Sequence, residues 1–220
     1  MAVVSRLPQA IIFDLDGTLV DTERLSKRAW DATQAELDWY LPDGFYETLI
    51  GVTNKQCDIM LAEVIPAEMG AAKFKAIAKE QYRRLISTEP IGKLGARALL
   101  ETCRTKGIRR CVASSSQREH GEVKLARAGL ASFFEFDLYG DEVEHGKPAP
   151  DLFLGAQERL GLAAEDLWII EDSPNGLKAA EAAGIRAILI PDLAPLTEAD
   201  RLRAWQIAPD LATVRGWLEG

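Results

Sequence analysis

The sequence of 220 residues is poor in cysteine and histidine, has no long apolar run and carries no excess of positive charge. Its three cysteines lack CxxC spacing, so we expect reduced thiols and no disulfide framework. With only two histidines and no serine–histidine signature, a Ser-His-Asp hydrolase is disfavoured. A formal net charge of −8 argues against nucleic-acid binding, because nucleic-acid binders normally present a basic face.

The apolar runs, of which Ile188–Pro191 is an example, are far too short to cross a bilayer. The segment Met1–Gln9 shows no basic region followed by an apolar one, so we see no secretory signal. Apolar residues make up 47% of the chain and charged residues 27%, which suits a globular protein and excludes wholesale disorder. We therefore expect a cytoplasmic protein without a membrane partner.

Short apolar runs alternate with segments of helical periodicity along much of the chain. Five runs are rich in Ile, Val or Phe and are bounded by charge or glycine: Ala10–Leu15, Ile108–Ser114, Phe133–Tyr139, Leu167–Ile170 and Ile185–Ile190. Runs of this length are typical of strands buried on both faces of a parallel sheet. Helical patterns over Ala96–Lys106 and Leu177–Ala183 end at Gly107 and Gly184, where we expect left-handed helix caps. The alternation predicts an α/β fold with a doubly wound, mostly parallel Rossmann-like sheet.

One stretch, from Thr22 to about Pro90, interrupts this alternation. It contains no convincing strand, only helical patterns such as Ala71–Ile86. We expect a helical insertion, residues 22–90, that forms a small cap domain over the sheet. Residues 1–21 and 91–220 would then form the α/β core.

Two aspartates, Asp14 and Asp16, stand where the first apolar run ends. Because side chains alternate along an extended chain, both would point the same way, into the crevice beyond the strand where open α/β sheets usually bind ligands. Two unpaired carboxylates there repel one another and call for a cation, for which Mg²⁺ is the obvious choice. Gly17 permits a tight turn after them. For this motif alone, solvated aspartates in a strand-to-turn segment are the alternative.

A second acidic pair, Glu171 and Asp172, follows the fourth run. Ser173 and Pro174 form the pattern of a helix N-cap and first helical residue. Taken alone, this is a pair of acids stabilised by a helix N-terminus. Because the pair repeats the acids of the first strand end, we favour a metal site shared between the two.

A serine cluster ends the second run. The hydroxyl of Ser114 and the following backbone N–H, that of Ser115, are placed to hold a phosphate oxygen. Ser116 begins a capping box with Glu119, so we assign Ser116 a structural role at the start of a helix.

A lysine, Lys147, lies in the rigid loop Gly146–Asp151, which contains two prolines. A lysine fixed in this way can neutralise both a carboxylate nucleophile and a phosphoryl group. Taken alone, it is a surface lysine in a turn. The neighbouring His145 is most simply a loop residue.

Acids, serine and lysine thus follow four different strands, and this combination resembles the haloacid dehalogenase (HAD) superfamily, most closely its β-phosphoglucomutase-like phosphatase branch. The resemblance covers nearly the whole chain, with core motifs at Asp14–Asp21, Ala113–Ser116, Gly146–Asp151 and Glu171–Asn175. It implies the α/β core with an inserted helical cap, and it implies that the cap decides the substrate.

For the site residues, the resemblance implies that Asp14 attacks phosphorus and forms an aspartyl-phosphate. Asp16 would protonate the leaving alcohol and then activate water. Mg²⁺ would be bound by the Asp14 carboxylate, the Asp16 backbone carbonyl and Asp172, with Glu171 as a further ligand or as a partner of the ligands. Ser114, Ser115 and Lys147 would bind the phosphate.

The substrate expected is a small phosphorylated metabolite, a sugar or polyol phosphate. We expect a monomer, although the sequence leaves the oligomeric state open.

Asp16 separates the chain from the dehalogenases, which lack an acid there. A hexose phosphate mutase is the alternative, disfavoured because Ser26 and Asn54 stand where the mutase has a histidine and an arginine. A phosphonatase would need a cap lysine that we do not locate. A non-catalytic binding module on the same fold is the alternative from another class.

Overall fold

A computed structural model describes residues 6–50 and 54–220, together with all side chains in these ranges except those of Asn54 and Lys55. The comparison with the mutase at Asn54 therefore lies outside the described side chains. The chain divides into two compact units. Unit 1 comprises the residues up to Asp21, Ile91–Asp192 and Leu196–Gly220, and unit 2 comprises Thr22–Pro90 and Leu193–Pro195.

Unit 1 contains a six-stranded sheet in the order β3-β2-β1-β4-β5-β6, with every neighbouring pair parallel. The strands are β1 (Ala10–Phe13), β2 (Arg109–Ser114), β3 (Asp137–Tyr139), β4 (Leu167–Glu171), β5 (Arg186–Leu189) and β6 (Gln206–Ile207). This is the doubly wound Rossmann-like sheet that the sequence predicts, and its order reverses between β1 and β4.

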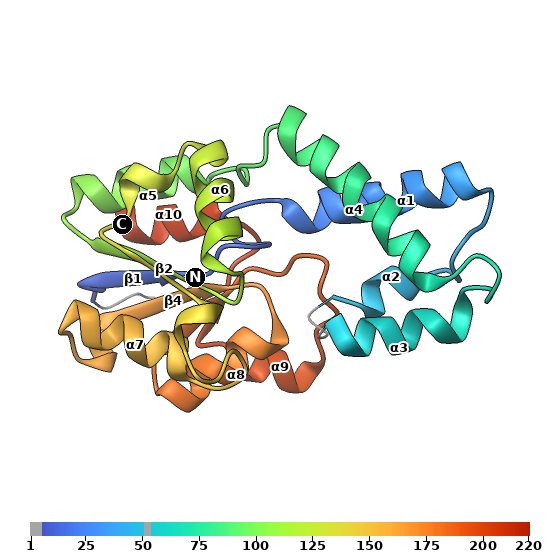
Figure 1. The fold of residues 1–220 in the computed structure, drawn as a ribbon. Helices are drawn as coiled ribbons and strands as arrows, with labels where there is room; N and C mark the ends of the chain where they lie inside the picture. Colours follow the sequence, from blue (N-terminus) through green and yellow to red (C-terminus); the bar gives the residue numbers. More distant parts are fainter. Residues whose placement is uncertain (1–5, 51–53) are drawn as a thin grey trace. The chain divides into compact units, whose positions relative to one another are not determined.

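Helices cover both faces of this sheet. In Figure 1, α5, α6 and α10 lie above the sheet and α7, α8 and α9 lie below it. Their bounds are α5 (Ala96–Thr105), α6 (Arg118–Ala128), α7 (Asp151–Leu160), α8 (Pro174–Ala183), α9 (Glu198–Arg203) and α10 (Leu211–Glu219). Three short 3-10 helices lie in the connections, at Ala131–Phe133, Gly140–Glu142 and Ala164–Asp166. With both faces covered, the central strands are mostly apolar, and all residues of β1 and β4 are buried.

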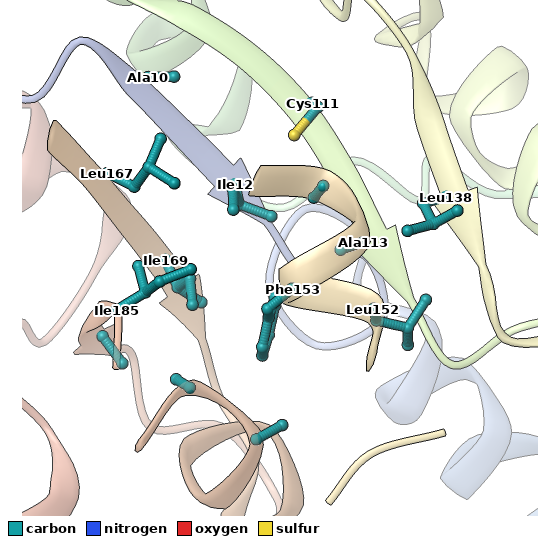
Figure 2. Packing of buried hydrophobic residues seen from close by; sticks show 14 of the residues in the cluster. Ala10, Ile12, Cys111, Ala113, Leu138, Leu152, Phe153, Leu167, Ile169 and Ile185 are labelled. Carbon is teal, nitrogen blue, oxygen red and sulfur yellow. The ribbon is translucent and has the colours of Figure 1, made fainter. Parts of the chain in front are cut away.

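One core lies between the sheet and the helices α7 and α8, and it is built from side chains of the strands and of these helices. Figure 2 shows Leu152 and Phe153 of α7 beside Ile12, Ala113 and Ile169 of the strands, and all five are completely buried. This packing fixes the position of α7 against the sheet. It therefore also fixes the end of the loop that precedes α7, which contains Lys147.

Of the four helix caps predicted from the sequence in unit 1, the structure contains three. Gly107 and Gly184 adopt the left-handed conformation, with φ of 69° each, and Ser173 caps α8 by accepting a hydrogen bond from the Gly176 N–H at 3.0 Å. These predictions are confirmed. The capping role of Ser116 is wrong, because the N-cap of α6 is Gln117 and the Ser116 hydroxyl donates to the Asp16 carboxylate at 2.7 Å.

The regular secondary structure in the described residues of unit 2 is α-helical, with α1 (Thr22–Leu37), α2 (Phe45–Thr48), α3 (Asn54–Val64) and α4 (Ala71–Thr88). Its core is aromatic: the ring of Trp30 lies edge-on to Phe74 at 5.2 Å and to Tyr46 at 5.3 Å between centroids. Across the described residues of both units, every helix is too short or too polar to cross a membrane.

Candidate active site

The acidic pairs, the serines and the lysine of the sequence motifs all lie in unit 1, at or beyond the carboxyl ends of β1, β2, β3 and β4. Because these strands are parallel neighbours, their carboxyl ends meet at one edge of the sheet. Asp14 leaves β1 and Asp172 leaves β4, the two strands between which the strand order reverses. In open α/β sheets this reversal opens the crevice that binds ligands.

Lys147 lies at the centre of the cluster with its side chain 4% exposed. Its Nζ donates to Asp14 Oδ1 at 2.5 Å, to Glu171 Oε1 at 2.7 Å and to the Ala113 carbonyl at 3.0 Å. An ammonium group has three donors, so these three acceptors satisfy it. Burial alone would lower the pKa of Lys147, but the charges of Asp14 and Glu171 raise it above its usual range. Lys147 is therefore a fixed cation beside Asp14, as the sequence interpretation requires.

Glu171 is held by donors on both carboxylate oxygens. Oε1 accepts from Lys147, and Oε2 accepts from the backbone N–H of Asp172 and Ser173, each at 2.8 Å, and from the Ser173 hydroxyl at 3.0 Å. These donors form the start of α8, where an anion is also favoured by the helix dipole. With both oxygens engaged, Glu171 is suited to hold Lys147 in place more than to bind a metal directly.

Gly176 gives this carboxylate its space. A Cβ at position 176 would lie 1.8 Å from the Cδ and Oε1 atoms of Glu171. We expect Gly176→Ala to displace Glu171 and with it Lys147, and so to lower phosphate release by about 10-fold or more, since small misplacements of catalytic groups are costly.

The matched control is Gly216→Ala in α10, where a Cβ would meet no atom within 4 Å. That change should leave activity intact and raise the free energy of unfolding by up to about 1 kcal/mol through helix propensity. Steady-state assays and urea unfolding of both variants measure the difference. Equal activity in the two variants would contradict the positioning role of Glu171.

The remaining charge of the cluster is negative. Asp14 is 7% exposed, and burial together with the charge of Glu171 raises its pKa from 3.8 to about 8 despite the opposing charge of Lys147. Asp172 is 5% exposed, and burial and then the charges of Glu171, Asp14 and Asp192 raise its pKa well above its usual range. A hydrogen-bonded or ion-paired partner of the Asp172 carboxylate is not found among the described residues. One lysine does not balance these acids.

A divalent cation fits this arrangement, because oxygen donors with excess negative charge are what Mg²⁺ binds in proteins. Among the described residues, there is no group of three or more His, Cys, Asp or Glu side chains that could hold a metal ion. The set expected from the sequence needs only two such side chains, Asp14 and Asp172, with the Asp16 backbone carbonyl as the third donor. The metal assignment stays a prediction.

Gly17 places Asp172 close to the loop after β1. Gly17 has φ of 81°, and a Cβ there would lie 2.1 Å from Asp172 Oδ2. The tight turn predicted at Gly17 therefore also makes room for the Asp172 carboxylate.

We expect Gly17→Ala to displace the Asp172 carboxylate and lower Mg²⁺-dependent phosphate release by about 100-fold. Gly107→Ala is the matched control, because Gly107 also has a positive φ, 69°, but a Cβ added there would meet no atom within 4 Å. The control should lose about 1–2 kcal/mol of stability from the left-handed backbone and keep its activity. If both variants lose activity in proportion to stability, the contact with Asp172 has no functional weight.

Asp16 lies in the same loop as Asp14, but its carboxylate contacts Ser116, just before α6, and Lys124, within α6. Oδ1 accepts from Lys124 Nζ at 2.6 Å and Oδ2 accepts from the Ser116 hydroxyl at 2.7 Å. The sequence interpretation missed Lys124 and gave Ser116 a different role.

The serines of β2 are only partly organised around the cluster. Ser114 is buried, with its hydroxyl accepting the Ser116 N–H at 3.1 Å, whereas Ser115 is exposed. Immediately before them, the Ala113 carbonyl accepts a hydrogen bond from Lys147 Nζ, which also donates to Asp14. Phosphate binding by Ser114 and Ser115 stays a prediction. His145 lies in the loop, exposed, with its ring 3.3 Å from the Asp151 carboxylate.

Comparison with known proteins shows that this chain is similar to phosphatases. The family model of the haloacid dehalogenase-like hydrolases matches residues 8–184. The phosphorylated carbohydrates phosphatase of Thermotoga maritima is 31% identical over 180 residues, covering 82% of this chain and 83% of that protein. The fructose-1-phosphate phosphatase YqaB of Escherichia coli is 29% identical, covering 81% and 94%.

A solved structure extends the likeness to the three-dimensional fold. The crystal structure of a CbbY variant from Rhodobacter sphaeroides, in complex with xylulose-(1,5)bisphosphate, superposes with a TM-score of 0.72 at 29% identity. It covers 94% of this chain and 96% of that one.

Proposed function

Because the chain belongs to the haloacid dehalogenase-like hydrolases, we propose that it hydrolyses the phosphate ester of a small sugar or polyol phosphate. The observation that carries this function is the buried Asp14, with Lys147 Nζ 2.5 Å from its Oδ1 at the point where the strand order reverses. Relatives named for phosphorylated carbohydrates and for fructose 1-phosphate support a sugar phosphate as the substrate class. A cytoplasmic location and a monomeric state stay predictions.

Asp14 is the proposed nucleophile. Its carboxylate would attack phosphorus, the ester oxygen would leave, and an aspartyl-phosphate would form. Lys147 would assist this step in two ways. Its charge favours the ionised form of Asp14, and it would neutralise negative charge on the incoming phosphoryl group. Ser114 and the Ser115 N–H would hold the phosphoryl oxygens.

Asp16 is the proposed proton-transfer group. It would give a proton to the leaving alcohol and then take one from the water that attacks the aspartyl-phosphate. After that second step, inorganic phosphate leaves and Asp14 returns to its starting state.

The residues suited to hold Mg²⁺ are Asp14 and Asp172 through their carboxylates and Asp16 through its backbone carbonyl, with Glu171 fixing the surroundings. A bound Mg²⁺ supplies neutralisation of the charge on the phosphoryl oxygens and on the two aspartates. The excess negative charge around Asp172 supports this assignment.

The test is phosphate release from a panel of sugar, polyol and nucleotide phosphates, with Mg²⁺ and with a chelator. We expect release that requires Mg²⁺ and that falls by at least about 1000-fold in Asp14→Asn, which removes the nucleophile. Glu165→Gln makes the same carboxylate-to-amide change on an exposed side chain and should retain full activity. Release that survives Asp14→Asn would overturn the mechanism, and wild-type protein without turnover on any substrate of the panel would favour the non-catalytic binding module.

The same assay separates the phosphatase from the mutase alternative. β-Glucose 1-phosphate is supplied, and both inorganic phosphate and glucose 6-phosphate are measured. A phosphatase releases phosphate faster than it forms glucose 6-phosphate. The reverse order would mean that a bisphosphate intermediate outcompetes water for the phosphoryl-enzyme, as in a mutase.

A further inference from the structure

The Asp16 carboxylate accepts hydrogen bonds from two residues outside its own loop, Lys124 and Ser116, which also contact each other. Lys124 Nζ donates to Asp16 Oδ1 at 2.6 Å and to the Ser116 hydroxyl oxygen at 3.1 Å, and that hydroxyl donates to Asp16 Oδ2 at 2.7 Å. All three residues therefore contact one another. Lys124 lies 108 residues from Asp16 in the sequence, within α6.

This arrangement is more than a surface ion pair. The Lys124 side chain is 14% exposed and that of Asp16 is 24% exposed, whereas pairs of little energetic weight are usually open to solvent. Ser116 stands beside the N-terminus of α6, where serine hydroxyls normally accept backbone N–H groups. Instead the hydroxyl binds Asp16, and the N-cap residue of α6, Gln117, makes no side-chain capping bond.

We infer that Lys124, together with Ser116, positions the Asp16 carboxylate for proton transfer in this active site. The inference rests on the proposed function, in which Asp16 is the group that exchanges protons. Lys124 and Ser116 each engage a different carboxylate oxygen of Asp16, so together they restrict the orientation of its side chain. A free Asp16 side chain would sample several rotamers, and its alignment with the leaving oxygen would be lost.

The test compares two substrates that differ in their need for a proton. A sugar or polyol phosphate releases an alkoxide-like oxygen and depends on general acid catalysis, whereas p-nitrophenyl phosphate releases a phenolate that leaves readily without a proton. We expect Lys124→Met to lower kcat/KM for the sugar phosphate by about 10-fold or more and kcat/KM for p-nitrophenyl phosphate by less than about 3-fold. Methionine keeps most of the side-chain volume and removes only the donor.

Two further variants define the comparison. Ser116→Ala should change the ratio of the two kcat/KM values in the same direction by a smaller factor, because it removes the uncharged partner. Lys106→Met, at an exposed lysine, should leave both values unchanged. Circular dichroism confirms that each variant is folded. The ratio kcat/KM is compared because it covers the steps up to release of the leaving group, so hydrolysis of the aspartyl-phosphate, which needs Asp16 with either substrate, does not enter.

A purely structural role for Lys124 predicts equal losses with both substrates, and that result would overturn the inference. Failure of the proposed function is distinguishable, because it would show as wild-type turnover that Asp14→Asn does not remove. An unchanged kcat/KM with both substrates in Lys124→Met, in an enzyme that still requires Asp14, would also overturn the inference.

Discussion

Replacing Lys147 with methionine is expected to lower phosphate release by about 1000-fold and the free energy of unfolding by about 3 kcal/mol. The activity falls because the fixed positive charge beside Asp14 disappears, and with it the group that would oppose the charge on the phosphoryl oxygens. The stability falls because two buried carboxylates, Asp14 and Glu171, lose the cation that faces both. Removing one partner of a buried ion pair is far more costly than losing a surface pair.

Lys147→Arg should not rescue this loss. The side chain is 4% exposed and Nζ already meets three acceptors at 2.5–3.0 Å, so the larger planar guanidinium has no room in the same place. Urea unfolding and steady-state assays of both variants give the two effects, with Lys106→Met as an exposed control. A Lys147→Met protein with wild-type stability would show that the buried carboxylates need no cation beside them.

The fold was predictable where local pattern and burial agree. β1 is a continuous apolar run, β4 is one up to its last residue, Glu171, and every residue in both strands is buried, so their position in a covered parallel sheet follows from the sequence pattern. β6 escaped prediction because Gln206–Ile207 is two residues long, lies at the sheet edge and is defined only by its pairing with β5. Likewise β3 is shorter than the run Phe133–Tyr139, because a 3-10 helix takes up Phe133.

The site was predictable where its residues directly follow strands. Asp14 and Asp172 lie just beyond the ends of β1 and β4, and parallel topology brings those ends together. Lys124 gave no such signal, because a lysine within α6 is indistinguishable in sequence from a solvated helix charge. Ser116 matched a capping rule, but a carboxylate from a distant loop offers its hydroxyl a stronger, charge-assisted bond. Side chains whose partners come from tertiary structure are thus the ones that local patterns cannot assign.

Asp14→Asn is expected to abolish turnover and yet to stabilise the metal-free protein at pH 8 by at least about 1 kcal/mol, or about 2–4 °C in Tm. The reason is the raised pKa of Asp14, about 8 against 3.8, which means that burial and Glu171 make ionisation costly in the folded state. The folded wild type therefore binds this proton more tightly than the unfolded chain. Its stability falls as the pH rises from about 4 to about 8.

An asparagine has no proton to lose, so the pH-dependent contribution of position 14 disappears in the variant. The stability difference between Asp14→Asn and wild type should consequently be small at pH 4, grow through this range and level off above pH 8. Thermal unfolding in chelator at several pH values measures it. Adding Mg²⁺ should stabilise the wild type more than the variant, because the cation offsets a charge that only the wild type carries. A variant less stable than wild type at pH 8 in chelator would mean that the Asp14–Lys147 pair outweighs the cost of burying the Asp14 charge, and the stabilities of Asp14→Asn and Lys147→Met would then fall together.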